Sequence, residues 1–209
     1  MEIKPMTHYS PICELAEVFT GLTLRGESSS KNDPNGTHRL VRISDISTDG
    51  VIGDGAPGRI SVEPKDADRY ALRARDVLVA ARGSRLTAAV FGREERAVAG
   101  SQFLIIRLLS EPQGVEPGFV VWYLNLPTVQ EQLSTEMRGS YVRSLPAGVL
   151  ARLRVPVPDR RKQTLIVALT ELQREENRLT SRIAERRARI IQQLASDSID
   201  FNPRANVLS

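Results

Sequence analysis

Residues 159–195 read DRRKQTLIVALTELQREENRLTSRIAERRARIIQQLA, a stretch without glycine or proline. This composition is typical of a long uninterrupted helix. Its leucines and isoleucines recur at alternating steps of three and four residues, which is the spacing of a heptad seam. The a positions hold Leu169, Ile183 and Ile190, and the d positions hold Leu165, Leu172 and Leu179.

The length of this helix bears on its partner. About 36 helical residues reach about 54 Å, so the helix overhangs a domain built from the rest of the chain. We therefore expect it to pack on another helix as a coiled coil, although Glu176, Arg186 and Gln193 interrupt the seam. The alternative is that the helix folds back on its own domain, because an apolar stripe of this width suits either partner.

Residues 1–158 have a different texture, with glycine and proline throughout. A capping serine and a proline predict a helix from Ser10 to Phe19, with Gly21 as its stop. Residues 153–158 predict a closing strand whose prolines restrict it to an edge. We expect further strands at 40–43, 59–62, 76–80, 88–91 and 103–108, and helices at 117–125 and 127–138.

The predicted fold class is α+β. Mixed β structure with short helices occupies residues 1–158, a long C-terminal coiled-coil helix follows at 159–195, and residues 196–209 form a polar tail.

Composition limits the class of protein. The chain has 209 residues and a single cysteine, Cys13, so an intramolecular disulfide is impossible and a reducing compartment is favoured. The N-terminus has no apolar run of signal-peptide length, and no stretch is long enough to span a membrane. The sequence thus predicts a soluble cytoplasmic protein without a membrane partner.

The basic residues are mostly of one type, since 25 of the 29 are arginine and the net charge is +4. The planar guanidinium suits phosphates and guanine edges, which favours a DNA partner. A GC-rich genome is an alternative explanation for the preference. Aromatic content of 5 % argues against a stacking platform for single strands.

The usual catalytic motifs are missing from the sequence. Residues 53–58 match GxGxxG, but Pro57 lies inside the match and a strand-like run follows, so we interpret it as a hairpin loop. No phosphate-binding GK[ST], HExxH or GxSxG motif occurs, and His8, His38 and Cys13 do not have metal-ligand spacing. We expect no catalytic residue, metal or cofactor in this chain, although scattered acidic residues that converge in space would favour an enzyme.

Three loops combine arginine or polar residues with glycine, at 28–36, 82–87 and 139–144. Hydroxyls, lysines and backbone amides hold phosphates, whereas arginine and asparagine read base edges. The candidate DNA contacts are Lys31, Asn32, Arg42, Arg82, Ser84, Arg85, Thr87, Ser140, Tyr141 and Arg143. We expect Arg143 to read a base and Arg82 and Arg85 to hold phosphates. The alternative is that these arginines pair with acids such as Asp76 or Glu94.

The order of these elements resembles one recognition domain and its following helix in the specificity subunits of type I restriction-modification systems. The matching segments are 15–18 with 20–21, 40–46, 70–78 with 82–84, and 139–150. Val155-Pro-Val-Pro158 followed by Gln163 resembles the junction between that domain and the spacer helix. The similarity covers about residues 12–195 and departs from the family in having one domain and one helix instead of two.

The resemblance implies a half-subunit: a DNA target recognition domain at 1–158 and a spacer and dimerisation helix at 159–195. Two copies would pack their helices antiparallel and read a bipartite palindromic DNA site. Glu176 and Arg186 could then face each other and fix the register. The dimerisation residues would be Leu165, Leu169, Leu172, Glu176, Leu179, Ile183, Arg186 and Ile190.

The implied partners are double-stranded DNA and a DNA adenine methyltransferase subunit, with or without a restriction and translocase subunit. S-adenosylmethionine, and ATP and Mg²⁺ where the translocase joins, would be bound by those partners. Two other interpretations stay open: the recognition subunit of another DNA-modification or phage-defence system, and a coiled-coil protein-interaction module that does not bind DNA.

Overall fold

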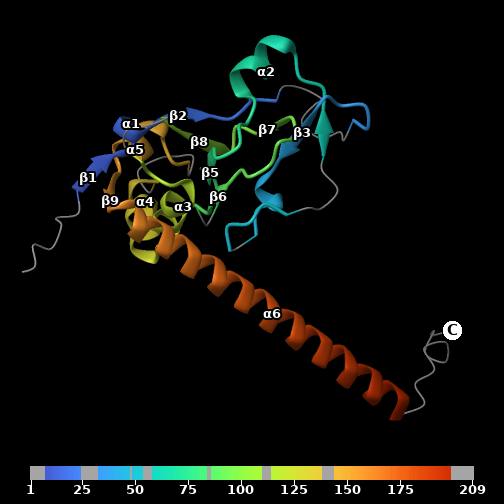
Figure 1. The fold of residues 1–209 in the computed structure, drawn as a ribbon. Coiled ribbons are helices and arrows are strands. Elements are labelled where there is room, and N and C mark those ends of the chain that lie inside the picture. The colour runs from blue at the N-terminus through green and yellow to red at the C-terminus, as the bar shows by residue number, and fades with distance from the viewer. Residues whose placement is uncertain are drawn as a thin grey trace, which may run out of the picture. The chain divides into compact units, whose positions relative to one another are not determined.

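The computed structural model describes residues 8–24, 33–47, 49–53, 58–83, 86–109, 114–137 and 144–198 (Figure 1). The chain divides into two compact units, the first ending at Val167 and the second beginning at Ala168.

A four-stranded antiparallel sheet is the middle layer of the first unit. In spatial order its strands are β2 (Ala16–Thr20), β8 (Phe103–Leu108), β5 (Val77–Ala80) and β6 (Ala88–Val90). Successive side chains of a strand point to opposite faces. Val77 and Val79 accordingly pack in the core beneath the helices, while Leu78 and Ala80 pack in a second core on the other face. Both faces of β5 are therefore buried, which explains its unbroken apolar sequence.

Two smaller sheets complete the β structure. The three-stranded sheet, on the second face, consists of β4 (Arg59–Ile60), β3 (His38–Val41) and β7 (Ala97–Ala99), with β3 and β7 parallel. A two-stranded sheet pairs β1 (His8–Pro11) with β9 (Arg154–Val157). Among the described residues, the proline-containing β9 has one partner strand, as predicted for an edge.

Helices cover the first face of the four-stranded sheet (Figure 1). Those helices are α1 (Ile12–Leu15), α3 (Pro117–Leu124), α4 (Pro127–Met137) and α5 (Ala147–Arg152). Separate from them, α2 (Pro64–Tyr70) precedes β5, and a 3₁₀ turn, η2 (Ile43–Asp45), follows β3. The predicted helices at 117–125 and 127–138 are confirmed, each with a proline at its first residue.

The predicted helix from Ser10 to Phe19 is wrong. The helix lasts four residues, and Ala16 already has extended backbone at φ −157° and ψ 157°. Residues 16–20 pair with the whole length of 104–108 in β8, so the ladder outweighs the local helical pattern. Gly21 does not end a helix, because it follows β2. Glycine is needed there for another reason: a Cβ would overlap the carbonyl oxygen of Gly100.

A buried ion pair ties the beginning of β5 to β8. Arg107 Nε and Nη2 donate to the two carboxylate oxygens of Asp76 at 3.0 and 2.7 Å. The Asp76 side chain is 2 % exposed. The Arg107 guanidinium also lies 5.0 Å from the centre of the Phe19 ring on β2. One side chain thus joins three neighbouring strands of the sheet.

The long helix, α6 (Arg160–Ser198), contains 39 residues and confirms the predicted C-terminal helix. Its first turns belong to the first unit, where Gln163 is 1 % exposed. The Gln163 amide donates to the carbonyls of Pro158 and Gly114 and accepts from the N–H of Glu116. One glutamine therefore satisfies three backbone groups where the helix leaves the domain.

Candidate nucleic-acid interface

The loop between β5 and β6 carries four of the predicted DNA contacts. Arg82 is exposed, whereas Thr87 is half-buried and its carbonyl accepts from the N–H of Ala80 at 3.0 Å. Gly83 has φ +109°, which glycine adopts without strain. Ser84 and Arg85 lie outside the described residues. The loop thus begins with an exposed arginine and ends anchored on the sheet.

Two of the predicted loops lie side by side. Arg82 forms an antiparallel backbone bridge with Ser144, and the N–H of Leu145 donates to the carbonyl of Ala81 at 2.8 Å. The end of the 139–144 segment is therefore fixed beside the β5–β6 loop. The contacts predicted within that segment, Ser140, Tyr141 and Arg143, lie outside the described residues.

Two amide side chains that we did not single out from the sequence, those of Asn125 and Gln130, bind the backbone at the end of the β5–β6 loop. Asn125 accepts from the N–H of Ala88 and donates to its carbonyl, both at 2.9 Å. Gln130 makes the same pair of bonds with Leu86, at 3.2 and 3.1 Å. Each amide imitates the backbone of a neighbouring strand, and together they fix the end of the loop that begins at Arg82.

Arg42 lies elsewhere, directly after β3 in the three-stranded sheet. Its side chain is half-buried, and its guanidinium packs against the Cα of Gly58, where a Cβ would overlap it. Its N–H donates to Asp45 Oδ2 at 2.9 Å. Within the described part of the chain, no hydrogen bond or ion pair joins Arg42 to the β5–β6 loop. Lys31 and Asn32 lie outside the described residues.

Of the two acids that we considered as alternative partners for the loop arginines, Asp76 and Glu94, the first already has a partner. Both carboxylate oxygens of Asp76 bind Arg107. Among the described residues, Arg82 makes no side-chain hydrogen bond or ion pair. Within the described part of the chain its guanidinium is therefore available to an external anion.

Arginine also sets the electrostatics of the three-stranded sheet. His38 on β3 is buried, and its pKa is lowered below 6.5 by burial and by the positive charges of Arg96 and Arg59. Arg39, 2 % exposed, donates to Glu95 Oε1 and to the carbonyl of Gly53, both at 2.8 Å. This arginine is part of the packed interior, unlike Arg82.

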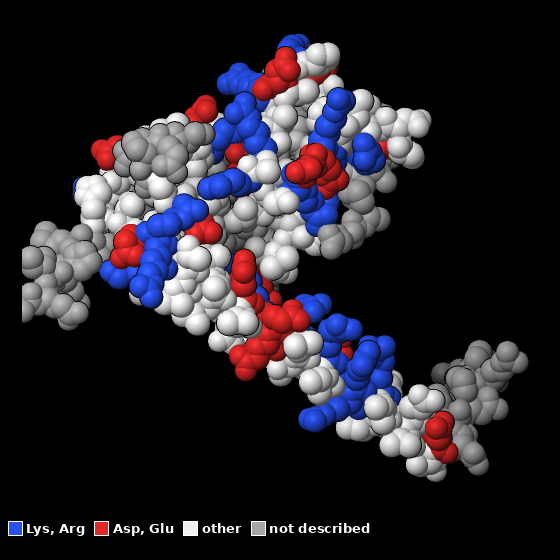
Figure 2. All heavy atoms as spheres, in the orientation of Figure 1, with Lys and Arg blue, Asp and Glu red and all other residues white. Residues whose placement is uncertain are grey.

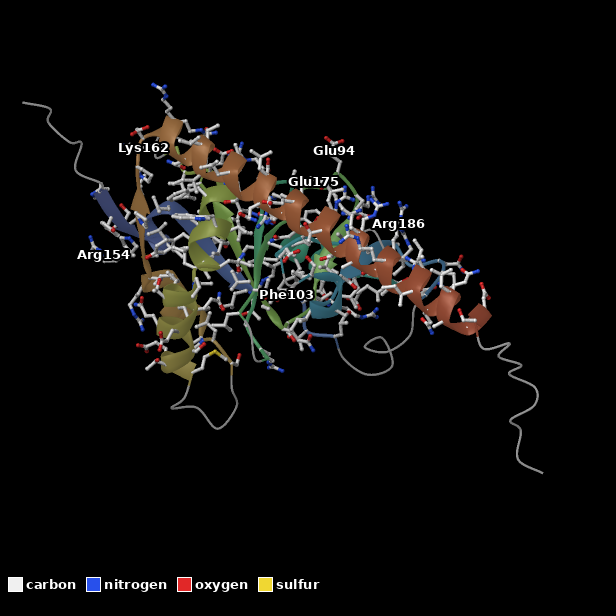
Figure 3. The ribbon with its side chains drawn as sticks, turned by 90° about the horizontal axis from the view of Figure 1, so that it is seen from below. Glu94, Phe103, Arg154, Lys162, Glu175 and Arg186 are labelled. Carbon is white, nitrogen blue, oxygen red and sulfur yellow. The ribbon has the colours of Figure 1, made fainter. Side chains whose placement is uncertain are left out.

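The predicted dimerisation residues all lie on α6 and form what we call the α6 seam: Leu165, Leu169, Leu172, Glu176, Leu179, Ile183, Arg186 and Ile190. Its apolar members are exposed in the single chain, from 46 % for Leu179 to 68 % for Leu172. Figure 3 labels Arg186, which belongs to the seam, and Glu175, which directly precedes the seam residue Glu176. An apolar stripe of this length that remains exposed indicates an interaction surface.

Two further observations concern metal sites and membrane spans. In the described part of the chain, no three His, Cys, Asp or Glu side chains come together as they would around a metal ion. No helix in the same residues has both the length and the apolar character needed to cross a membrane.

Comparison with solved structures identifies the class of fold: a mixed α+β domain followed by one long helix, as in the S subunits of type I restriction-modification systems. A structure from work on complex assembly and conformational transition of the type I R-M system matches with a TM-score of 0.69 at 16 % identity, over 96 % of this chain and 46 % of that one. The HsdS subunit from Thermoanaerobacter tengcongensis matches with a TM-score of 0.60 at 14 % identity, over 88 % and 41 % of the two chains.

The S subunit of a type I system from M. genitalium matches with a TM-score of 0.55 at 16 % identity, over 90 % and 45 %. The chain thus spans less than half the length of each of these structures. No protein-family profile and no curated protein matches the sequence. The structural likeness confirms the fold predicted from the sequence resemblance.

Proposed function

We propose that this chain is a sequence-specific recognition subunit for double-stranded DNA. In this proposal it pairs with a second copy through the α6 seam and directs a partner DNA adenine methyltransferase to a bipartite palindromic site. The likeness of nearly the whole chain to type I S subunits supports the recognition role. The observation that carries the proposal is the exposed α6 seam, because an apolar heptad seam is the surface on which a second helix packs.

The charges of α6 favour an antiparallel partner. Residues 168–177 contain three glutamates and one arginine, for a net charge of −2, whereas residues 178–190 contain five arginines and one glutamate, for +4. Figure 2 shows the acidic band followed by the basic band along this helix. A parallel pair would place the two basic bands together, while an antiparallel pair places each beside an acidic band.

One antiparallel register matches the seam from Leu172 to Ile190. With the two-fold axis beside residue 181, Leu179 faces Ile183 of the second copy and Leu172 faces its Ile190. The same register places Glu176 opposite Arg186, so the two charged interruptions form an ion pair. A shift by one heptad in either direction leaves Arg186 against an apolar residue, Leu169 or Ile183, which is costly in a buried seam. The charged pair therefore selects the register.

Sedimentation equilibrium of the full chain tests the pairing. We expect a dimer for the wild type at micromolar concentration and a monomer for Leu179→Asp with Ile183→Asp, because the two carboxylates would be buried without partners. Ser181→Asp with Ala188→Asp adds the same charge on the opposite face of α6 and should leave the dimer intact. A monomeric wild type would remove the basis for self-pairing.

Disulfide trapping tests the orientation in a Cys13→Ser background. Antiparallel pairing predicts that Leu172→Cys alone and Ile190→Cys alone give no covalent dimer, while an equal mixture of the two does. Parallel pairing predicts that each variant cross-links with its own kind. The two orientations thus give opposite patterns.

DNA recognition is tested by selection from a pool of randomised duplexes. We expect the wild type to enrich one bipartite palindromic sequence. Arg82→Ala should weaken binding to that site, whereas Arg161→Ala, which removes an exposed arginine from the first turn of α6, should not. Enrichment of no sequence, with the dimer intact, would favour a coiled-coil protein-interaction module instead.

In this proposal the chain performs no chemistry. S-adenosylmethionine binds to the methyltransferase subunit, and ATP and Mg²⁺ bind to a translocating nuclease subunit where one joins. We expect the purified chain to neither methylate nor cleave DNA when all three are supplied, and methyl transfer to begin when the methyltransferase subunit is added. Methyl transfer by the chain alone would contradict the adaptor role.

A further inference from the structure

A pocket in the first unit has four arginines in its wall. It lies where the α2–β5 turn, the end of β8 and the beginning of α6 meet, and its volume is about 360 Å³. Ligand sites typically occupy about 300–1,000 Å³, so this pocket is large enough for a small group. We call it the arginine pocket, after Arg73, Arg75, Arg107 and Arg160. In Figure 2, basic side chains gather on the face of the first unit that carries the beginning of α6.

Two of these arginines hold the wall together. Arg107 is bound to Asp76, the acid among the described lining residues, and also donates to the carbonyl of Ala71 at 2.8 Å. Arg160 donates to the carbonyl of Gly114 at 3.2 Å and lies 3.8 Å from a carboxylate oxygen of Glu116. Their positions are therefore set by the protein itself, before any ligand binds.

The guanidinium groups of the other two arginines have no partner among the described residues. Arg73 and Arg75 are exposed, and within the described residues neither guanidinium has a hydrogen bond or an ion pair. Arg75 has φ +78°, in the left-handed region that glycine or asparagine occupies more easily. Its N–H donates to the carbonyl of Phe91 at 2.8 Å, which holds it in this conformation. An arginine at a position that favours glycine suggests that its side chain is used.

We propose that the arginine pocket binds a phosphate group. Guanidinium groups match phosphate oxygens with paired hydrogen bonds, and a phosphate offers more charge and more acceptors than a carboxylate. Arg73 and Arg75 bind it, while Arg107 and Arg160 shape the wall and add positive potential. The phosphate comes from the DNA backbone or from a free phosphate compound, and the first of these sources rests on the proposed function.

The free source is tested with inorganic phosphate on the full chain, by thermal unfolding at constant ionic strength. Phosphate at ten times its dissociation constant should raise the wild-type Tm by about 3–6 °C more than acetate does. Arg73→Gln with Arg75→Gly should abolish this difference and still fold, since glycine suits the backbone at position 75. The control is Arg69→Gln with Arg161→Gln, which removes the same charge from exposed arginines outside the pocket.

The DNA source is tested with the same variants by measuring binding to unrelated duplexes at several salt concentrations. A variant that neutralises one phosphate fewer than the wild type has a slope of log K against log salt that is shallower by about 0.9, equally for all sequences. Loss of the phosphate shift with an unchanged DNA slope identifies a free phosphate compound, and a shallower slope identifies the backbone.

Failure of the phosphate site and failure of the proposed function give different results. If the wild type binds no DNA but keeps its phosphate-specific Tm shift, the phosphate site stands and the proposed DNA recognition is refuted. A pocket variant that matches its charge control in both measurements overturns the phosphate site and leaves DNA recognition untouched. An acetate shift as large as the phosphate shift also overturns it.

Discussion

Gln163 connects α6 to the recognition domain, and its removal should destabilise the first unit. Gln163→Ala leaves the N–H of Glu116 and the carbonyl of Pro158 without their described partners, while the carbonyl of Gly114 keeps its bond from Arg160. An unsatisfied buried polar group costs about 1–3 kcal/mol. Because Glu116 and Pro158 are half-buried, water relieves part of this, and we expect a loss of about 2–4 kcal/mol in the free energy of unfolding.

Urea denaturation followed by tryptophan fluorescence measures this loss in the correct unit. Trp122 is the only tryptophan of the chain, and its ring lies 5.3 Å from that of Phe119 in the core of the first unit. Gln173→Ala is the matched control, because Gln173 is exposed on the same helix and its loss should cost less than about 0.5 kcal/mol.

A third variant separates hydrogen bonding from packing. Gln163→Leu fills a similar volume without donors or acceptors, so it should be as destabilising as Gln163→Ala. Recovery of wild-type stability by the leucine variant would show that Gln163 acts by filling space. Equal unfolding midpoints for Gln163→Ala and Gln173→Ala would refute the anchoring role altogether.

Three further substitutions test other parts of the first unit, with urea denaturation as the measurement. Asp76→Asn should lower stability by about 3–5 kcal/mol, because it leaves Arg107 charged and partly buried without its partner; a loss below about 1 kcal/mol would contradict this. His38 has a pKa below 6.5 in the folded state, so the unfolded chain binds a proton more readily and stability falls as the pH drops through about 6.5. His38→Gln should therefore lose less stability than the wild type between pH 7.5 and 5.5, and equal losses would remove His38 as the cause. Gly21→Ala should cost about 1–3 kcal/mol through backbone overlap, whereas Gly92→Ala, with open space around its Cβ, should cost little.

The elements predictable from the sequence are those whose signal is local. The α6 seam has a heptad period, and β8 begins with four consecutive apolar residues, Phe103 to Ile106, which are enough to identify a strand. Helices α3 and α4 begin at Pro117 and Pro127, which marks their first residues. Each of these patterns is complete within one segment of chain.

The missed elements depend on partners far away in the sequence. Residues 97–99 read Ala-Val-Ala, which favours no strand by itself, and become β7 through pairing with β3. Residues 16–20 carry a helical pattern and become a strand because β8 lies beside them. Such choices are decided by ladders that form only when the domain assembles.

The same distinction holds for the candidate sites. The residue types beside a glycine predict a loop with an exposed arginine, and Arg82 lies there, while its contact with DNA stays a prediction. The amides of Asn125 and Gln130 act on residues about 40 positions away, as do the bonds of Gln163 to Gly114 and Glu116. The arginine pocket likewise combines residues 73–76, 107 and 160, which no linear motif connects.

The two amides that bind Leu86 and Ala88 also affect how the protein associates. A strand at the edge of a sheet offers unpaired backbone groups to any other chain, and this is a common route to aggregation. At the beginning of β6 and just before it, the backbone groups of Ala88 and Leu86 are already occupied by Asn125 and Gln130, so a foreign strand would have to displace two paired amides before it could add there. The protein can therefore expose the apolar α6 seam to a partner helix while this edge of its sheet resists the addition of foreign strands.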